Sequence, residues 1–338
     1  MLLSEFDVPF DPALVAAQPV SPRDRARLLV LHRATGARTH RQVSDLPELL
    51  QPGDLLVVNN TKVIPARLVG RKQPAGTPVE VLFVKDLGGS VWDVMMKGHF
   101  RVGQRISFDN DACATVVKRD ATGTAVKVES ADPVTQLLHE HGQMPLPPYI
   151  KRSPGPDDHR WYQTVFAKQE GAIAAPTAGL HFTPQLLNRL AERSIQVTSV
   201  TLHVGPGTFK PVTAERIEDH QMGEERFEIG EEAAAAIAKT KAAGGRVVAV
   251  GTTVVRTLET AAASGALKAT SGSSRLFIAP GFTFRVVDAL MTNFHLPRTT
   301  LIILVSAFAG IDSIKSAYAD AVRERYRFYS YGDAMLIL

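Results

Sequence analysis

The sequence predicts a layered α/β domain with an inserted antiparallel β-barrel-like domain, and three observations lead to this fold class. Strand-like and helix-like segments alternate after about residue 159, as in α/β proteins with a largely parallel sheet. Short strand-like segments separated by turns fill residues 79–129, as in small barrels or sandwiches. A buried-strand pattern, DLLVVNNTKV, also precedes residue 65. The β segment therefore interrupts the α/β domain.

The inserted domain is expected to span residues 67–150, and the α/β domain residues 1–66 and 151–338. A length of 338 residues suits two domains. The proline-rich tract from Met144 to Pro156 excludes regular helix and predicts an extended exit from the inserted domain. The expected strands of this domain are VEVLFV, VWDVMM, RISF, ATVV and TAVKVES.

The α/β domain is expected to alternate strands with amphipathic helices. Its predicted helices are TPQLLNRLAERS, EEAAAAIAKTKAA, TVVRTLETAAAS and IKSAYADAVRERY. Its predicted strands, besides DLLVVNNTKV, are VTSVTLHV, RVVAV, RLFIA and TLIILV. The Gly- and Ser-rich segment ATSGSSR, residues 269–275, is expected to be a loop between a helix and a strand.

Composition limits the compartment and the partners. The net charge of +4, from 38 Lys and Arg against 34 Asp and Glu, allows a polyanionic partner without requiring one. The single cysteine, Cys113, excludes an intramolecular disulfide framework and a cysteine-based zinc site, which favours a reducing compartment. The N-terminus lacks a signal-peptide pattern, and the longest apolar stretch is too short to span a bilayer. We expect a cytoplasmic protein without a membrane span.

Glycine- and histidine-bearing turns recur at the ends of predicted strands. Ligands of open α/β sheets bind beyond the carboxyl ends of the strands, so these turns are expected to form one pocket. The four segments are AAPTAGLHFTP (174–184), LHVGPGTF (202–209), AVGTTVVRTLE (249–259) and TNFHLP (292–297).

The third of these turns predicts an anion site. The strand RVVAV stops at Gly251 and a helix follows, so free backbone N–H groups and the hydroxyls of Thr252 and Thr253 would face a ligand. Arg256 and Glu259 lie three residues apart on one helical face and could reach the same ligand. A capped helix with a surface ion pair is an equally good interpretation of this segment alone.

Three histidines, His181, His203 and His295, lie in these turns and are candidates for a general acid or base. Any one of them could instead be held by backbone hydrogen bonds. Because the sequence has no HExxH pair and its HxH pair, His139 and His141, lies outside these turns, we expect no metal site. Dinucleotide, P-loop and α/β-hydrolase motifs are also missing. The residues alone therefore indicate an α/β enzyme with a His- and Thr-lined pocket for an anionic ligand.

At these same segments the sequence resembles the S-adenosylmethionine:tRNA ribosyltransferase-isomerases of queuosine biosynthesis. The resemblance extends almost from end to end and includes FDVP, DLLVVNNTKVIPARL, YQTVFA, AAPTAGLHFT, VTLHVGPGTFKPV, VGTTVVRTLE, DALMTNFHLPRTTLIILVSAFAG and YRFYSYGDAMLI. It implies transfer and isomerisation of the ribosyl part of S-adenosylmethionine onto 7-aminomethyl-7-deazaguanine at the tRNA wobble position. The products would be epoxyqueuosine-tRNA, adenine and methionine. No further cofactor is implied, and we expect a monomer.

The resemblance gives the pocket residues roles. The catalytic candidates are His181, His203, His295 and Glu259, and which one is acid and which is base stays open. The residues expected to bind S-adenosylmethionine are Pro176, Thr177, Ala178, Gly179, Gly205, Gly207, Thr208, Gly251, Thr252, Thr253, Arg256, Thr292 and Asn293.

Basic residues flanking these segments are candidates for tRNA phosphate contacts, although each could equally be a solvated surface charge. They are Lys62, Arg67, Lys97, Arg101, Lys151, Arg152 and Arg298. The aromatic run Tyr326, Phe328, Tyr329 and Tyr331 is expected either to stack on an unpaired anticodon base or to belong to the core.

The chain departs from the family pattern after His220, where Gly223 stands in a histidine place and Arg226 in an aromatic one. This departure leaves two alternatives open. A paralogue would cleave S-adenosylmethionine but transfer the ribosyl group to a small molecule or another RNA. A non-catalytic tRNA-binding protein fits less well, because a pure binder does not need the small-ligand turns.

Overall fold

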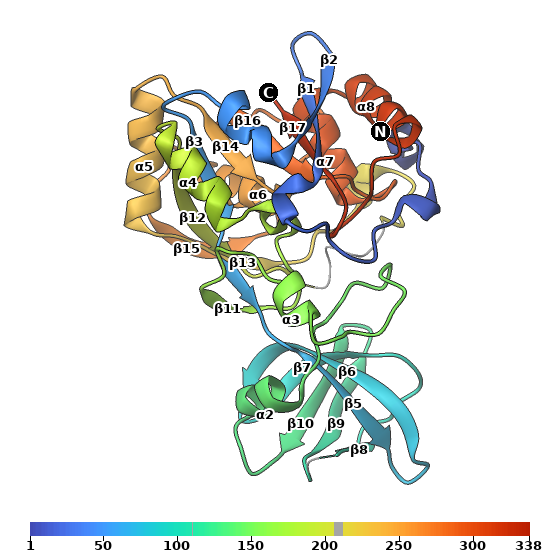
Figure 1. Cartoon of the computed structure of the whole chain (residues 1–338). Helices are drawn as coiled ribbons and strands as arrows, with labels where there is room; N and C mark the ends of the chain where they lie inside the picture. The colour runs from blue at the N-terminus through green and yellow to red at the C-terminus, as the bar shows by residue number, and fades with distance from the viewer. Residues whose placement is uncertain (110, 206–211) are drawn as a thin grey trace. The chain divides into compact units, whose positions relative to one another are not determined.

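The computed structural model describes residues 1–109, 111–205 and 212–338, which divide into two compact units. Unit 1 comprises Met1–Lys62, Pro148–Arg152 and Trp161–Leu338, and unit 2 comprises Val63–Pro147 and Ser153–Arg160 (Figure 1). An α/β unit interrupted in sequence by an antiparallel barrel confirms the predicted fold class. The domain limits expected from the sequence stay a prediction, because the chain alternates between the units within residues 148–160.

Unit 2 is built around a closed antiparallel barrel with the strand order β10-β7-β6-β5-β8-β9. At Gly70 in β5 the neighbouring strand β8 comes so close that a Cβ would lie 2.8 Å from Ser107 O. Glycine is therefore required for this strand pairing. The strands are β5 (Arg67–Lys72), β6 (Thr77–Gly88), β7 (Val91–Met96), β8 (Arg105–Phe108), β9 (Cys113–Asp120) and β10 (Gly123–Glu129), and the helices are α2 (Val134–His141) and α3 (Asp158–Trp161).

Unit 1 contains a sheet that, over the described residues, has nine strands in the order β15-β13-β12-β3-β14-β16-β17-β1-β2. The expectation of a largely parallel sheet is wrong, because only the pairs β12–β3, β3–β14, β14–β16 and β1–β17 are parallel and the other four are antiparallel. The strands are β1 (Arg27–His32), β2 (Ala37–Gln42), β3 (Leu55–Asn59), β12 (Gln196–Leu202), β13 (Glu225–Ile229), β14 (Val247–Val250), β15 (Thr270–Ser274), β16 (Ala289–Asn293) and β17 (Ala334–Ile337). Strands β4 (Thr61–Val63) and β11 (Gln169–Ala172) form a separate pair.

The central strands are buried on both faces, because successive side chains point to opposite sides of a sheet. Leu55 and Val57 of β3 belong to the apolar cluster under α5 and α6, whereas Leu56 and Val58 belong to the cluster under α4. The helices of this unit are α1 (Leu46–Leu49), α4 (Pro184–Glu192), α5 (Glu231–Ala242), α6 (Thr252–Ala261), α7 (Thr300–Ala309) and α8 (Ile311–Arg323) (Figure 1).

The four helices predicted in unit 1 are confirmed as α4, α5, α6 and α8, but the strand predicted at TLIILV is wrong. These residues form α7, which is buried almost throughout and begins after Thr299, whose hydroxyl accepts a hydrogen bond from Ile302 N. An apolar run does not distinguish a buried strand from a buried helix, and here the N-cap decides. In the part of the chain that the structure describes, no single helix could span a membrane. Only α7 and α8 together pass by length and composition, as a pair bent by 113°.

The strand predicted at RLFIA, residues 275–279, is also wrong. The strand in this region is β15, which occupies Thr270–Ser274 in the segment expected to be a loop. Strand β15 lies at the edge of the sheet and is exposed except at Ser274. Its backbone pairs with β13, so an edge strand forms here without the apolar side chains that a buried strand needs.

Candidate functional site

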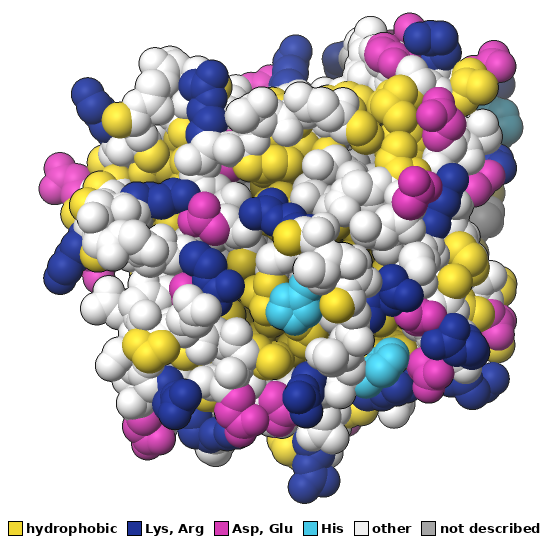
Figure 2. Space-filling model, turned by 90° about the horizontal axis from the view of Figure 1, so that it is seen from above, with side chains coloured by type: hydrophobic (Ala, Val, Ile, Leu, Met, Phe, Trp, Pro, Cys, Tyr) yellow, Lys and Arg dark blue, Asp and Glu magenta, His cyan; other side chains and the backbone are white. Residues whose placement is uncertain are grey.

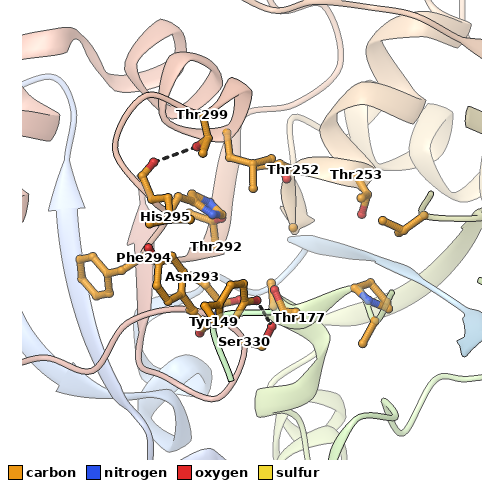
Figure 3. Close-up of a pocket in the computed structure, with 18 residues that line it drawn as sticks. Tyr149, Thr177, Thr252, Thr253, Thr292, Asn293, Phe294, His295, Thr299 and Ser330 are labelled. Atoms are coloured by element: carbon orange, nitrogen blue, oxygen red, sulfur yellow. Dashed lines mark hydrogen bonds between the residues drawn. The ribbon is translucent and has the colours of Figure 1, made fainter. Parts of the chain in front are cut away.

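A pocket in unit 1 opens at the carboxyl ends of β12, β14 and β16. These strands and β3 run in the same direction, so the segments that follow them meet at one edge of the sheet. All four Gly- and His-bearing segments contribute to the lining (Figure 3). The lining residues are Tyr149, 175–178, Val204, 251–253, 292–296, Thr299, Leu301, Tyr329 and Ser330. The empty volume, which includes space open to solvent, is about 710 Å³.

The N-terminus of α6 forms one wall of this pocket. Strand β14 ends at Val250, Gly251 turns the chain with φ = 96°, and the helix begins at Thr252. A side chain at residue 251 would be strained at this positive φ. The backbone N–H groups of a first helical turn have no acceptor within the helix, so this wall can bind an anion.

Three buried polar atoms of the pocket lack a hydrogen-bond partner among the described residues. They are Thr253 Oγ1, Asn293 Oδ1 and the Tyr329 hydroxyl. Leaving a buried polar atom unpaired costs about 1–3 kcal/mol, so native proteins rarely retain such atoms without a function. Their position in one cavity fits a site that a polar ligand completes.

His295 is the one of the three candidate histidines that lines the pocket. Its Nε2 lies 2.7 Å from the Thr292 hydroxyl, and its backbone N–H donates to the Tyr318 hydroxyl at 2.7 Å. Burial lowers the pKa of His295 to about 3, because the charged imidazolium would lose its hydration. The ring is therefore neutral at physiological pH.

His181 and His203 lie outside the lining. His181 is buried behind Asn293, with Nε2 3.1 Å from Asn293 Nδ2, and burial with the charges of Arg23 and Arg327 lowers its pKa to about 3. His203 is half-buried next to β4, and its Nδ1 lies 2.8 Å from the Thr61 hydroxyl. Burial is the main cause that lowers the pKa of His203. The structure does not bring the three rings together in one pocket.

Arg256 and Glu259 are also engaged elsewhere. Arg256 forms a buried ion pair with Glu225 of β13 and donates to Leu276 O, although its Nη2 has no partner among the residues described. It is therefore not the freely available carboxylate clamp expected from the sequence. Glu259 accepts three backbone N–H bonds, from residues 285, 286 and 287, at 2.8–3.0 Å. Glu259 therefore holds the backbone of the segment that precedes β16, and it is not part of the pocket lining.

The remaining predicted binding residues divide into three groups. Pro176, Thr177, Ala178, Gly251, Thr252, Thr253, Thr292 and Asn293 line the pocket. Gly179 and Gly205 do not line it, although both directly flank lining segments. Gly207 and Thr208 lie outside the described residues.

Sequence reasoning missed the aromatic wall of the pocket. The rings of Tyr149 and Tyr329 stack with centroids 4.4 Å apart, and the Tyr149 hydroxyl lies 2.5 Å from Ser330 Oγ (Figure 3). Tyr149 belongs to the proline-rich tract, which the sequence predicts only as an extended connection. Tyrosine between prolines was the only available signal, and it does not specify a partner.

The aromatic run near the C-terminus belongs to the interior of unit 1. Tyr326, Phe328 and Tyr331 are at most 2% exposed, and Tyr329 is 6% exposed with its ring against the pocket. For Tyr326, Phe328 and Tyr331 the expectation of stacking on an anticodon base is therefore wrong, because rings this deeply buried cannot reach a nucleic-acid base, and the alternative interpretation as core residues holds. Tyr329 differs from these three, because it lines the pocket.

The predicted tRNA contacts differ in their availability. Lys62 pairs with Glu170, and Arg298 forms two hydrogen bonds with Asp7. Arg67 donates to Leu146 O, and Arg152 donates to Ala17 O. Within the described part of the chain, no ion pair is found for the exposed residues Lys97, Arg101 and Lys151. Figure 2 shows basic side chains interspersed with acidic ones over the face displayed.

One of the two departures from the family pattern, Arg226, contacts His203. Arg226 is in β13, its carbonyl accepts from His203 N, and its positive charge contributes to the lowered pKa of that histidine. A Cβ at Gly223 would meet no atom within 4 Å, so the backbone leaves room for a side chain there. Both departures are outside the pocket lining.

No group of three or more His, Cys, Asp or Glu residues that could hold a metal ion occurs in the described ranges 1–109, 111–205 and 212–338. The polar chemistry of the pocket is that of hydroxyls, an amide, a neutral imidazole and backbone N–H groups. Such groups suit hydrogen bonds to an organic ligand.

Comparisons with known proteins agree over the whole chain. The family model described as "Queuosine biosynthesis protein" matches residues 3–337. A protein of Moorella thermoacetica is 52% identical over 100% of both chains, and one of Anaeromyxobacter sp. is 51% identical over 100% of this chain and 99% of its own. Both are named S-adenosylmethionine:tRNA ribosyltransferase-isomerase. The crystal structure of S-adenosylmethionine tRNA ribosyltransferase from Thermotoga maritima matches with a TM-score of 0.58 and 38% identity, covering 99% of this chain and 100% of that one.

Proposed function

Because the chain belongs to the family of queuosine biosynthesis proteins, we propose that it is an S-adenosylmethionine:tRNA ribosyltransferase-isomerase. It transfers the ribosyl part of S-adenosylmethionine to 7-aminomethyl-7-deazaguanine at the tRNA wobble position. The bonds from the ribosyl group to adenine and to the methionine sulfur break, and rearrangement gives epoxyqueuosine. S-adenosylmethionine is a substrate in this reaction and is consumed.

One observation carries the assignment of the pocket to S-adenosylmethionine. Three unpartnered polar atoms, an aromatic wall and a helix N-terminus converge on the same cavity. The carboxylate of the donor suits the N–H groups at the start of α6. Its ribose and adenine groups suit the unpaired atoms of Asn293 and Tyr329, since they offer both hydrogen-bond donors and acceptors.

The reaction needs a base that takes the proton next to the sulfonium. His295 is the best candidate, because it is the one candidate histidine in the pocket lining. A neutral imidazole accepts a proton, whereas only its protonated form can supply one. Because the His295 ring is neutral, we do not assign to it the role of the acid that assists adenine departure.

The tRNA contacts that we propose are Lys97 and Arg101 in unit 2 and Lys151 in unit 1. Each is exposed, and exposed cations neutralise phosphates with an affinity that falls as salt rises. Lys62 and Arg298 are weaker candidates, because a phosphate would have to compete with their carboxylate partners.

Adenine release from S-adenosylmethionine tests this function. We expect adenine and methionine to appear only with tRNA that carries 7-aminomethyl-7-deazaguanine, and the tRNA to gain the epoxycyclopentanediol group. Release without any RNA would instead show a paralogue acting on another acceptor. If adenine were released neither with this tRNA nor without RNA, the protein would be a binding protein and the proposal would be contradicted.

A further inference from the structure

His181 is buried behind the pocket, and its ring is hydrogen-bonded to a residue of the pocket lining. Its Nε2 lies 3.1 Å from Nδ2 of Asn293, which ends β16. The same Nδ2 donates to the backbone carbonyl of Tyr329 at 3.1 Å. His181 and Asn293 are 4% and 2% exposed, so these contacts are not shared with bulk water.

These contacts fix the direction of the Asn293 amide. The Tyr329 carbonyl can only accept a hydrogen bond, so the amide must turn its NH₂ group toward it. The second N–H of this group then points at His181 Nε2, which has to be the acceptor. Both N–H groups are used, and Oδ1 is the polar atom of this side chain that stays unpaired.

The protonation state of His181 agrees with this arrangement. An acceptor Nε2 requires the neutral ring with its proton on Nδ1. Burial, together with the charges of Arg23 and Arg327, keeps the pKa of His181 at about 3. Arg23 also donates to the carbonyl of Leu180 at 3.3 Å, so a positive charge lies beside the segment that carries the histidine.

We propose that His181 is a positioning residue that holds the Asn293 amide with Oδ1 toward the pocket, where it accepts a hydrogen bond from an N–H or O–H group of S-adenosylmethionine. This inference rests on the proposed function. It differs from the sequence-based assignment of His181 as an acid or base, because the ring acts through Asn293 and is not part of the lining. Bound S-adenosylmethionine would supply the hydrogen bond that Asn293 Oδ1 lacks.

Two substitutions of His181 separate positioning from acid–base chemistry. Gln in the H181Q variant can place its amide oxygen near the position of Nε2 and accept the Asn293 N–H, but it cannot exchange protons near neutral pH. Leu in the H181L variant offers no acceptor. We expect H181L to weaken S-adenosylmethionine binding about tenfold, the order of one lost hydrogen bond, and H181Q to stay within about threefold of the wild type in binding and in adenine release.

The measurements are calorimetric binding of S-adenosylmethionine and the rate of adenine release with tRNA. Analogues of S-adenosylmethionine with a 6-oxo group or a 2′-deoxyribose identify the group that donates to Asn293 Oδ1. The loss of affinity caused by H181L should disappear for the analogue that lacks this group. An H181Q variant that binds S-adenosylmethionine normally but releases adenine about 10²-fold more slowly than the wild type would behave as expected when a general acid or base is lost. This result would overturn the positioning role.

A third variant keeps the proposal testable if H181L fails to fold. In N293D a carboxylate oxygen takes the place of the NH₂ group, so Nε2 of His181 has to donate, either as the other neutral tautomer or as the protonated ring, and the new negative charge raises the pKa of the ring. Nitrogen NMR should show the His181 ring neutral in the wild type and titrating at a higher pH in N293D. An unchanged His181 titration would contradict the coupling, whereas a wild type without adenine release would refute the proposed function alone.

Discussion

Position at the cavity, and not burial, decides which histidine can act at this pocket. His181 and His295 both have a pKa lowered to about 3, but only the His295 ring borders the cavity. His203 is half-buried, contacts Thr61 and lies outside the lining. The sequence placed all three beside glycine or proline in turns after strands, and it could not rank them, because their contacts come from distant segments.

Replacing His295 with alanine tests its role. We expect the rate of adenine release to fall by about 10²-fold or more, as when a general base is lost, while the protein still binds S-adenosylmethionine. His203→Ala is the matched control and should stay within about threefold of the wild type. Equal losses in both variants, or no loss in H295A, would contradict this assignment.

The pH dependence gives the same assignment a second measurement. Since the pKa of His295 is lowered to about 3, the neutral ring predominates at every pH well above that value. The rate in a pH profile between about 5.5 and 8 should therefore not fall through the ordinary histidine pKa of about 6.5. A decline toward acid centred near 6.5 that is lost in H295A would contradict it.

At the scale of elements, helices with an apolar stripe could be predicted and other elements could not. The sequences of α4, α5, α6 and α8 each combine apolar and polar positions at helical spacing. Helix α7 is apolar on nearly all sides, so its periodicity gives no signal. Strand β15 forms because its backbone pairs with β13, and this pairing leaves no signal in the amino-acid composition of the strand.

The ion pair between Glu225 of β13 and Arg256 of α6 ties two elements together next to the pocket. Both side chains are under 9% exposed, so removal of one charge leaves the other buried and unpaired. We expect E225Q to lower the free energy of unfolding by about 3–5 kcal/mol in urea titrations. The adjacent control E224Q loses an exposed pair with Arg275 and should cost less than about 1 kcal/mol. Equal small losses would show that the buried pair does not stabilise the fold.

At the scale of the whole molecule, the pocket and the proposed phosphate contacts are distributed unequally between the two units. Every described lining residue of the pocket belongs to unit 1, and two of the three proposed phosphate contacts belong to unit 2. The fold class and four pocket-forming segments could be predicted, because they depend on the alternation of strand-like and helix-like segments and on turn residues, which are local properties of the sequence. The aromatic wall from Tyr149 and Tyr329 could not, since it joins two segments 180 residues apart in the sequence, a distance over which no local pattern extends.

The central claim is that S-adenosylmethionine occupies the pocket at the carboxyl ends of β12, β14 and β16. A crystal structure of the protein with S-adenosylmethionine tests it most directly. We predict the ligand in this pocket, with polar atoms within hydrogen-bond distance of Thr253 Oγ1, Asn293 Oδ1 and the Tyr329 hydroxyl. A ligand bound elsewhere, with these three atoms still unpaired, would contradict the account.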